Sequence, residues 1–291
     1  MLYELLEWNF CNRWCSIAER LAYISGVFLG KPYVLNALGE GDEGEFNQNP
    51  RYRWDAFDCV TYVNTMLALL ASVNPIEFHY HMAFLNYRSG IVKFEKRHHF
   101  MSVDWNIANA EYGYVRDITP EIEDNYGNPL CCYASTYIDK PNWFKQRSLS
   151  DLKINAQLSE VQLNAKLAQL KKTSEKISGI QACTPYLALK NIFNSDGEIF
   201  FEIKMQLPKA MIVEIIRPNW NLVKQIGTNL NVSHVGFLLE VQDQLIFRHA
   251  SQEQKKVVDQ PLELYLYRYL QSPTVKGINL QQILPKLKNE S

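Results

Sequence analysis

The spacing of apolar residues changes along this chain, and that change constrains the fold more than any other feature of the sequence. Up to about residue 195 the clearest pattern is helical, and we predict helices over 12–29, 59–72, 77–89 and 158–172, a loop over 30–54, a short extended segment over 91–94 and a mixed pattern over 104–147. Beyond it, four runs rich in β-forming residues predict strands over 198–207, 210–217, 234–241 and 244–250. Helices that precede a set of strands are typical of an α+β fold in which the helices pack on an antiparallel sheet.

Charge and hydropathy exclude several classes of protein. The chain has 30 basic and 31 acidic residues, so its net charge of −1 gives no general attraction to nucleic acid. No segment approaches the ~20 apolar residues of a membrane span, and the N-terminus carries Glu4 and Glu7 where a secretory signal would be basic and then apolar. We expect a monomer with no nucleic-acid partner and no membrane span, either cytoplasmic or a mature periplasmic or cell-envelope form.

Cys59 stands apart from the other five cysteines. The sequence has no zinc-type CxxC pair, so most of its thiols are expected to be free and structural. Cys59 follows Asp58 and opens a predicted helix, where free backbone N–H groups and the helix dipole favour a thiolate and could stabilise an oxyanion. The alternative, a buried cysteine on an amphipathic helix, stays open on this stretch alone.

A second candidate site is the run "NVSHVGFLLEVQDQLIFRHASQ", which predicts a β-hairpin with His234 at the start of one strand and His249 near the end of the next. If the turn has an even length and is centred on Gln242-Asp243, His249 faces Gly236 and His234 lies diagonally opposite on the same face. An odd turn without a bulge would put the two imidazoles on opposite faces. The alternative is two unrelated histidines.

A third stretch, "KFEKRHHFMSVDW", concentrates positive charge. Arg97 with His98 and His99 could bind an anion, and together with His79 and His81 the histidines could also suggest a metal site. Taken alone, the stretch is better explained as a solvated basic loop.

Several short motifs, taken in order, resemble a known family. "FDCVTYV", "SHVGF" and "RHAS" are similar to the NlpC-type papain-like cysteine peptidases and amidases of bacterial cell walls. "FLGKPYVLNAL" (28–38) and "RHHFMSVDW" (97–105) narrow the resemblance to the branch described as N-acetylmuramoyl-L-alanine amidase-like. The sequence departs from that pattern at "IVEIIRPNW", where a glycine-aspartate pair is expected, and residues 140–195 have no counterpart.

The resemblance implies a reaction and a set of roles. Cys59 would be the nucleophile, His234 the base, and His249 the group that orients the base. The thiolate would attack an amide carbonyl and form an acyl-enzyme that water hydrolyses, without a metal or an organic cofactor. The substrate would be peptidoglycan or a muropeptide, cut between N-acetylmuramic acid and L-alanine or at a peptide bond of the stem.

The same comparison yields candidates for substrate binding, which are Tyr33, Arg97, His99, Asp104, Trp105 and Ser233. Arg97 and His99 are predicted to line the cleft that holds Cys59, because arginine pairs well with the carboxylates of a stem peptide. Asp104 could orient Arg97, and Trp105 could offer an apolar face to the sugar or lactyl group.

For the chain as a whole, the resemblance implies one papain-like, NlpC-type domain over 1–291, with a largely helical insertion or lid over 140–195. Other classes of function stay open at this point. A metal hydrolase built from Cys59 and the histidine pairs would hold zinc. A non-catalytic binding or effector module would leave Cys59 with ordinary thiol reactivity. A translocated protein acting on a host amide is also compatible with the sequence.

Overall fold

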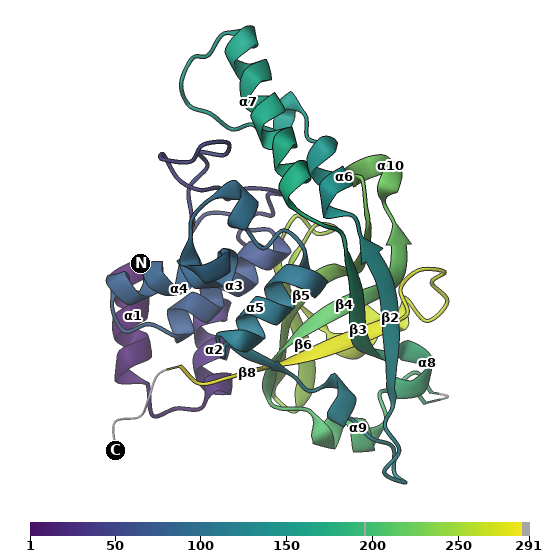
Figure 1. Cartoon of the computed structure of the whole chain (residues 1–291). Coiled ribbons are helices and arrows are strands. Elements are labelled where there is room, and N and C mark those ends of the chain that lie inside the picture. Colours follow the sequence, from purple (N-terminus) through teal and green to yellow (C-terminus); the bar gives the residue numbers. More distant parts are fainter. Residues whose placement is uncertain (195, 287–291) are drawn as a thin grey trace.

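The structure is a computed structural model, and it describes residues 1–194 and 196–286 (Figure 1). The α-helices in these ranges are α1 (Leu2–Cys11), α2 (Ile17–Gly26), α3 (Cys59–Leu70), α4 (Pro75–Asn86), α5 (Asn106–Glu111), α6 (Lys140–Lys145), α7 (Glu160–Lys172), α8 (Leu189–Ile192), α9 (Phe201–Gln206), α10 (Val223–Ile226) and α11 (Leu262–Tyr267). The strands are β1 (Val115–Asp117), β2 (Cys131–Ile138), β3 (Ile180–Ala188), β4 (Ala210–Asn221), β5 (Asn229–Val241), β6 (Gln244–Ser251), β7 (Lys256–Pro261) and β8 (Gly277–Ile283). A single π-helical turn, η3 (Met101–Trp105), precedes α5.

All described strands belong to one sheet with the order β2-β3-β8-β4-β5-β6-β7, and β1 pairs with β8 beside this path. Every pair of neighbouring strands is antiparallel. The predicted α+β class with an antiparallel sheet is therefore confirmed. No helix within the described ranges has both the length and the apolar character to cross a membrane.

The two faces of the sheet bury different partners because successive side chains of a strand point to opposite sides. Val235 and Phe237 of β5 pack in a core with α1, α2, α3 and α4. Leu238 of β5 and Phe247 of β6 pack in a second core with α8, α9 and α11. In Figure 1 the N-terminal helices gather on one side of the strands, whereas α8 and α9 lie at their lower end.

The predicted strand over 198–207 is wrong. Residues Phe201–Gln206 form the helix α9, in which Ile203 is buried while Phe201 and Met205 are largely exposed. Gly197, with φ of +81°, precedes this short helix, and Ile199 and Ile203 pack in the second core, with Leu207 partly buried against it.

The segment 140–195 contains both helices and a strand. It begins with α6 and α7, and α7 projects away from the sheet at the top of Figure 1. It continues as β3, which pairs with β2 and β8 inside the sheet. Its last residue, Ser195, lies outside the described residues. The role of α6 and α7 as an insertion or lid stays a prediction.

Candidate active site

Cys59 is the first residue of α3, and the residues around it explain why the helix begins there. The Asp58 carboxylate accepts a hydrogen bond from the Thr61 N–H at 2.8 Å, and the Thr61 hydroxyl accepts one from the Asp58 N–H at 2.9 Å. This reciprocal capping satisfies two of the free donors at the helix start. The thiol thereby lies beside Val235 of the inner strand β5.

The thiol of Cys59 does not have the lowered pKa that its helix position suggests. The backbone N–H groups of Val235 and Val60 do favour the thiolate, but burial and the nearby Asp58 carboxylate outweigh them and raise the pKa of Cys59 to about 12. The helix start therefore has the effect on the thiolate that the sequence predicts, but the desolvation of the anion is larger than this effect. A thiol with this pKa is protonated near pH 7.

The histidine hairpin forms as predicted. Val241 pairs with Gln244, so the turn is the two-residue Gln242-Asp243, and both turn residues have positive φ. This turn twists with the strands and sets the register of β5 against β6. His249 then lies against Gly236, where any side chain would meet the His249 Cβ at 2.6 Å.

The two imidazoles meet on one face of this hairpin. His234 Nε2 lies 2.6 Å from His249 Nδ1, and His249 is 2% exposed. The predicted contact between these rings is present, while their catalytic roles stay predictions. Burial lowers the pKa of His234 to about 3 and the pKa of His249 to about 4, so both rings are neutral near pH 7.

Gln260 on β7 extends the row of hydrogen-bonded side chains that His234 and His249 begin, and the sequence analysis did not predict it. His249 Nε2 lies 2.8 Å from Gln260 Oε1, which can only accept, so the His249 proton sits on Nε2. His249 Nδ1 then accepts from His234 Nε2–H, which leaves His234 Nδ1 as a free basic nitrogen. The missing information was the β6–β7 pairing, in which Phe247 lies opposite Gln260.

The start of β5 is shaped by a bulge and an anchor. Ile215 pairs with His234 but Ile216 pairs with Val232, so Ser233 is an extra residue between them. Just upstream, the buried Asn231 amide donates to the Ala134 carbonyl at 3.1 Å and to Thr184 Oγ1 at 3.0 Å. This anchor ties the strand to β2 and β3, so the backbone that presents His234 is fixed on both sides.

A cavity of about 170 Å³ brings several of the predicted residues together. Cys59, His99, Ser233 and His234 all line it. No hydrogen bond joins the Cys59 sulfur to either imidazole of the hairpin among the described residues, so direct contact between nucleophile and base stays a prediction. Tyr33 lies close by, since burial and then Cys59 raise the pKa of its hydroxyl.

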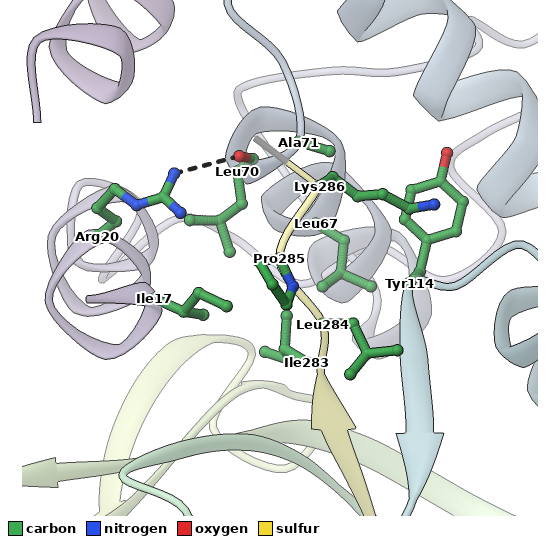
Figure 2. Close-up of a pocket in the computed structure, with 10 residues that line it drawn as sticks. All are labelled: Ile17, Arg20, Leu67, Leu70, Ala71, Tyr114, Ile283, Leu284, Pro285 and Lys286. Atoms are coloured by element: carbon green, nitrogen blue, oxygen red, sulfur yellow. Dashed lines mark hydrogen bonds between the residues drawn. The ribbon is translucent and has the colours of Figure 1, made fainter. Parts of the chain in front are cut away.

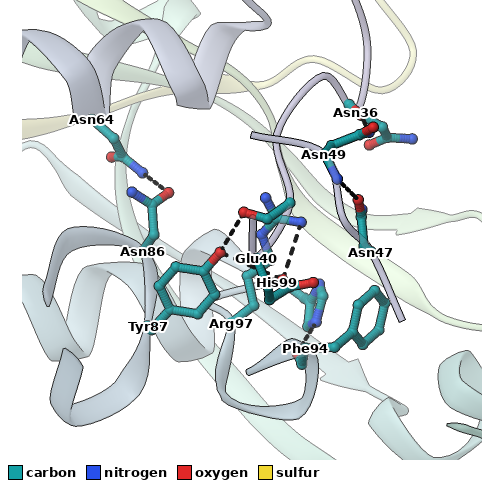
Figure 3. A network of polar contacts seen from close by, with 11 residues as sticks. Asn36, Glu40, Asn47, Asn49, Asn64, Asn86, Tyr87, Phe94, Arg97 and His99 are labelled. Atoms are coloured by element: carbon teal, nitrogen blue, oxygen red, sulfur yellow. Dashed lines mark hydrogen bonds and ion pairs between the residues drawn. The ribbon is translucent and has the colours of Figure 1, made fainter. Parts of the chain in front are cut away.

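Arg97 does not line this cavity, which corrects the prediction that it would. Its guanidinium pairs with Glu40 at 3.7 Å, and the Tyr87 hydroxyl donates to the same carboxylate at 3.4 Å (Figure 3). The Glu40 side chain is 2% exposed, so a buried carboxylate engages this cation. His99 does line the cavity, and its Nε2–H donates to the Phe94 carbonyl at 2.8 Å.

Asp104 and Trp105 serve the structure of the loop. Asp104 pairs with Lys140, so it does not orient Arg97. Trp105 is fully buried and donates from Nε1 to Asn64 Oδ1 of α3 at 2.8 Å. Trp105 therefore offers no face to a sugar, and that prediction was wrong. Its physical role is to fasten η3 to α3, which holds Met101 and Ser102 at the rim of the cavity.

Other parts of the molecule are weaker candidates for a site. The depression between α2, α3 and the end of β8, shown in Figure 2, encloses about 10 Å³, and the described residues that line it include no cysteine, serine or histidine. Within residues 1–194 and 196–286 no three side chains of His, Cys, Asp or Glu converge in a way that could hold a metal ion. The alternative of a zinc hydrolase built from Cys59 and the histidine pairs has no such cluster in these ranges.

The model of the family described as AmiA-like, N-acetylmuramoyl-L-alanine amidase-like, matches residues 23–274. No match was found among curated proteins.

Solved structures share the fold. A Legionella pneumophila protein of the family DUF1460 has a TM-score of 0.91 at 36% identity, covering 97% of this chain and 94% of its own. An N-acetylmuramoyl-L-alanine amidase from Bacteroides uniformis has a TM-score of 0.61 at 21% identity, covering 92% of this chain and 98% of its own. A Bacteroides fragilis protein whose name proposes a xylanase has a TM-score of 0.59 at 21% identity, covering 89% and 99%.

Proposed function

This chain belongs to the N-acetylmuramoyl-L-alanine amidase-like family, and from that membership we propose that it is a cysteine amidase acting on peptidoglycan fragments. The bond we assign to it joins the lactyl group of N-acetylmuramic acid to L-alanine. Family membership supports a hydrolase of amide bonds, and the similar Bacteroides uniformis protein carries the name of this activity. We also propose that the architecture is of the papain-like, NlpC type, with α3 as the nucleophile helix.

The observation that carries the proposal is the polar row Gln260–His249–His234 ending beside the cavity of Cys59. The row fixes one tautomer in each imidazole and leaves His234 Nδ1 free to take a proton. This is the orienter and base of a nucleophile–base–orienter triad, with Gln260 holding the orienter in turn. Catalytic hydrogen bonds are often long in substrate-free enzymes and tighten in the complex, which is the approach we propose for Cys59 and His234.

The raised pKa of Cys59 determines how the reaction would begin. A thiol that is neutral near pH 7 gives up its proton to His234 as its sulfur attacks the amide carbonyl. A carbon–sulfur bond forms, the carbon–nitrogen bond breaks, and the proton on His234 passes to the leaving amine. Water, deprotonated by the same histidine, then hydrolyses the thioester and returns the thiol.

The remaining predicted residues take supporting parts in this proposal. Tyr33 keeps its proton because burial raises its pKa, so its hydroxyl can donate to the oxyanion that forms near Cys59. Ser233 and His99 line the cavity and can contact the acyl side of the substrate.

The raised pKa of Cys59 also supports a second candidate, a binding module that has kept the fold without catalysis. Such a module would retain muropeptides and leave them intact. The two candidates therefore differ in the products they release.

The deciding experiment incubates the protein with purified muropeptides and reads the products by mass spectrometry. We expect free stem peptides and N-acetylmuramic acid from the wild type and none from Cys59→Ala. Cys183→Ala, which alters an exposed free cysteine, is the matched control and should retain activity. Intact muropeptides with wild-type protein would reject the amidase, and cleavage within the stem peptide would make it an endopeptidase of the same fold.

A further inference from the structure

A second cavity, of about 330 Å³, opens beside His234 and His249. Its lining differs in kind from that of the cavity around Cys59. Two arginines and three aromatic residues contribute to it, namely Arg217, Trp220, Tyr265, Arg268 and Tyr269. By contrast, the described residues that line the Cys59 cavity include no arginine or lysine, and many are apolar, such as Val60, Phe100 and Val232.

Arg217 is only partly satisfied within the protein. Its Nη1 donates to Thr274 Oγ1 at 2.7 Å, and its guanidinium lies over the Trp220 ring at 4.7 Å. Its Nε is buried and has no hydrogen-bond partner in the described ranges. A buried guanidinium nitrogen without an acceptor is costly, and an anion entering the cavity would supply one.

Arg268 faces the same cavity from the other side. Its guanidinium packs over Tyr265 at 4.4 Å and Tyr269 at 4.8 Å, and its Nη1 pairs with Glu253 at 2.9 Å. Glu253 also lines the cavity, but its side chain is 71% exposed, so water screens its charge. With both histidines neutral, the two arginines outweigh the single carboxylate and leave the cavity positive.

The chemistry of amide cleavage decides which half of the substrate would enter this cavity. The histidine that takes the thiol proton must deliver it to the leaving amine, so the leaving group lies on the histidine side of the scissile bond. In the proposed reaction the leaving group is the stem peptide, which carries free carboxylates, and the acyl half is an uncharged lactyl sugar.

We propose that the cavity of Arg217 and Arg268 is the subsite for the leaving peptide and that the two arginines bind its nearest free carboxylate. This inference rests on the proposed function, since it assumes that His234 protonates the amine. Guanidinium groups pair with carboxylates through charge-assisted hydrogen bonds, and Trp220 and Tyr269 supply apolar walls for the peptide backbone. The Cys59 cavity then receives the acyl half.

The test compares N-acetylmuramoyl-L-alanyl-D-glutamate with its counterpart in which both glutamate carboxylates are amidated. Arg217→Gln and Arg268→Gln should each lower kcat/KM for the acid by about tenfold or more and for the amide by less than about twofold, since one charge-assisted contact is lost. Arg217→Lys, which keeps the charge, should lose less. Arg116→Gln, on an exposed arginine of β1 away from both cavities, is the matched control. Equal losses on both substrates would overturn the subsite.

A binding measurement separates this inference from the proposed function. Calorimetry of the Cys59→Ala protein with the free peptide L-alanyl-D-glutamate needs no turnover, and we expect Arg268→Gln in that background to weaken binding about tenfold or more. If the wild type cleaves muropeptides but neither arginine affects peptide binding, the subsite is wrong and the amidase stands. If nothing is cleaved yet binding depends on the arginines, the amidase is wrong and the carboxylate site stands.

Discussion

The hairpin of β5 and β6 and the loop from Phe94 to Trp105 are both rich in histidine or arginine, yet they use these side chains in opposite ways. In the hairpin, His234 and His249 bond to each other and to Gln260, and the row ends at two cavities. In the loop, the polar groups bond inward, Arg97 to Glu40 and Trp105 to Asn64. Clustered polar residues therefore indicate a site only when their geometry leaves a group free to act.

The largest expected effect tests the hairpin. His234→Ala should lower kcat/KM on muropeptides by about 10²–10⁴-fold, because the neutral Cys59 thiol then has no base. The unfolding temperature should change little in comparison, since the ring borders two cavities. His79→Ala, on an exposed histidine, is the control. If His234→Ala keeps its activity, the contrast between the two regions is wrong, because the hairpin is then no more catalytic than the loop.

The next test concerns the structural role of the loop. Trp105→Ala should lower the free energy of unfolding by about 3–5 kcal/mol, since a fully buried indole and its bond to Asn64 are lost. Trp14→Ala removes a ring that is 59% exposed and should cost less than about 0.5 kcal/mol. Chemical denaturation measures both. A stable Trp105→Ala protein with lost activity would instead assign Trp105 to the substrate.

A smaller effect probes how the hairpin row works. Gln260→Leu removes the acceptor that holds the His249 proton on Nε2, and we expect kcat to fall about tenfold with KM nearly unchanged. Gln260→Glu keeps an acceptor and should restore most of that loss. Because a carboxylate favours a charged imidazole, Gln260→Glu should also shift the acidic limb of the pH–rate profile upward. Identical profiles for the two variants would mean that Gln260 only fills space.

Arg97 gives the sharpest contrast with the arginines of the second cavity. Arg97→Gln leaves the buried Glu40 carboxylate without its cation, so we expect stability to fall by about 1–3 kcal/mol. Its losses in kcat/KM on acidic and amidated muropeptides should agree within about twofold, which would mean that it supports the fold. A loss of kcat/KM confined to the acidic substrate would show that Arg97 binds the substrate, as the sequence suggested.

The last test concerns the pH dependence of stability in the loop. Burial and then the nearby Arg97 charge lower the pKa of His99 to about 3, from 6.5. The unfolded chain binds this proton first, so stability from His99 is present above about pH 6.5 and is lost as pH falls toward about 3. In urea unfolding between about pH 7 and pH 4, His99→Gln should lose stability less steeply than the wild type. An unchanged slope would show that His99 is not buried as a neutral ring.

The regions also differ in how far sequence could predict them. In a strand, alternation fixes which way His234 and His249 point once the turn length is known, so their contact could be predicted on the condition of an even turn. Gln260 lies one strand further on, and its contact depends on a pairing that spacing does not reveal. In a loop no such period exists. That Arg97 and Trp105 point inward follows from partners at Glu40 and Asn64, which are distant in sequence.

The same reasoning applies to the fold. The change from helical to strand patterning predicted the α+β class, and the short run 198–207 was misassigned because isolated apolar residues fit either element. Cys59 illustrates a different limit. Its place at the helix start, next to Asp58, could be read from the sequence, but the burial that raises its pKa most comes from packing.

The bulge at Ser233 suggests how this site could be gained or lost in evolution. Upstream of it, β5 follows the register that lets Asn231 bond to β2 and β3, and downstream it follows the register that brings His234 to His249. Deleting Ser233 would turn the side chains of one of these two parts of β5 to the opposite face of the sheet, since a shift of one residue moves each side chain to the other face. An added residue in the Gln242-Asp243 turn would do the same to His249. The site is therefore more vulnerable to the insertion or deletion of a single codon than to most substitutions. A gene that keeps every residue of the site could still lose the activity through one such insertion or deletion.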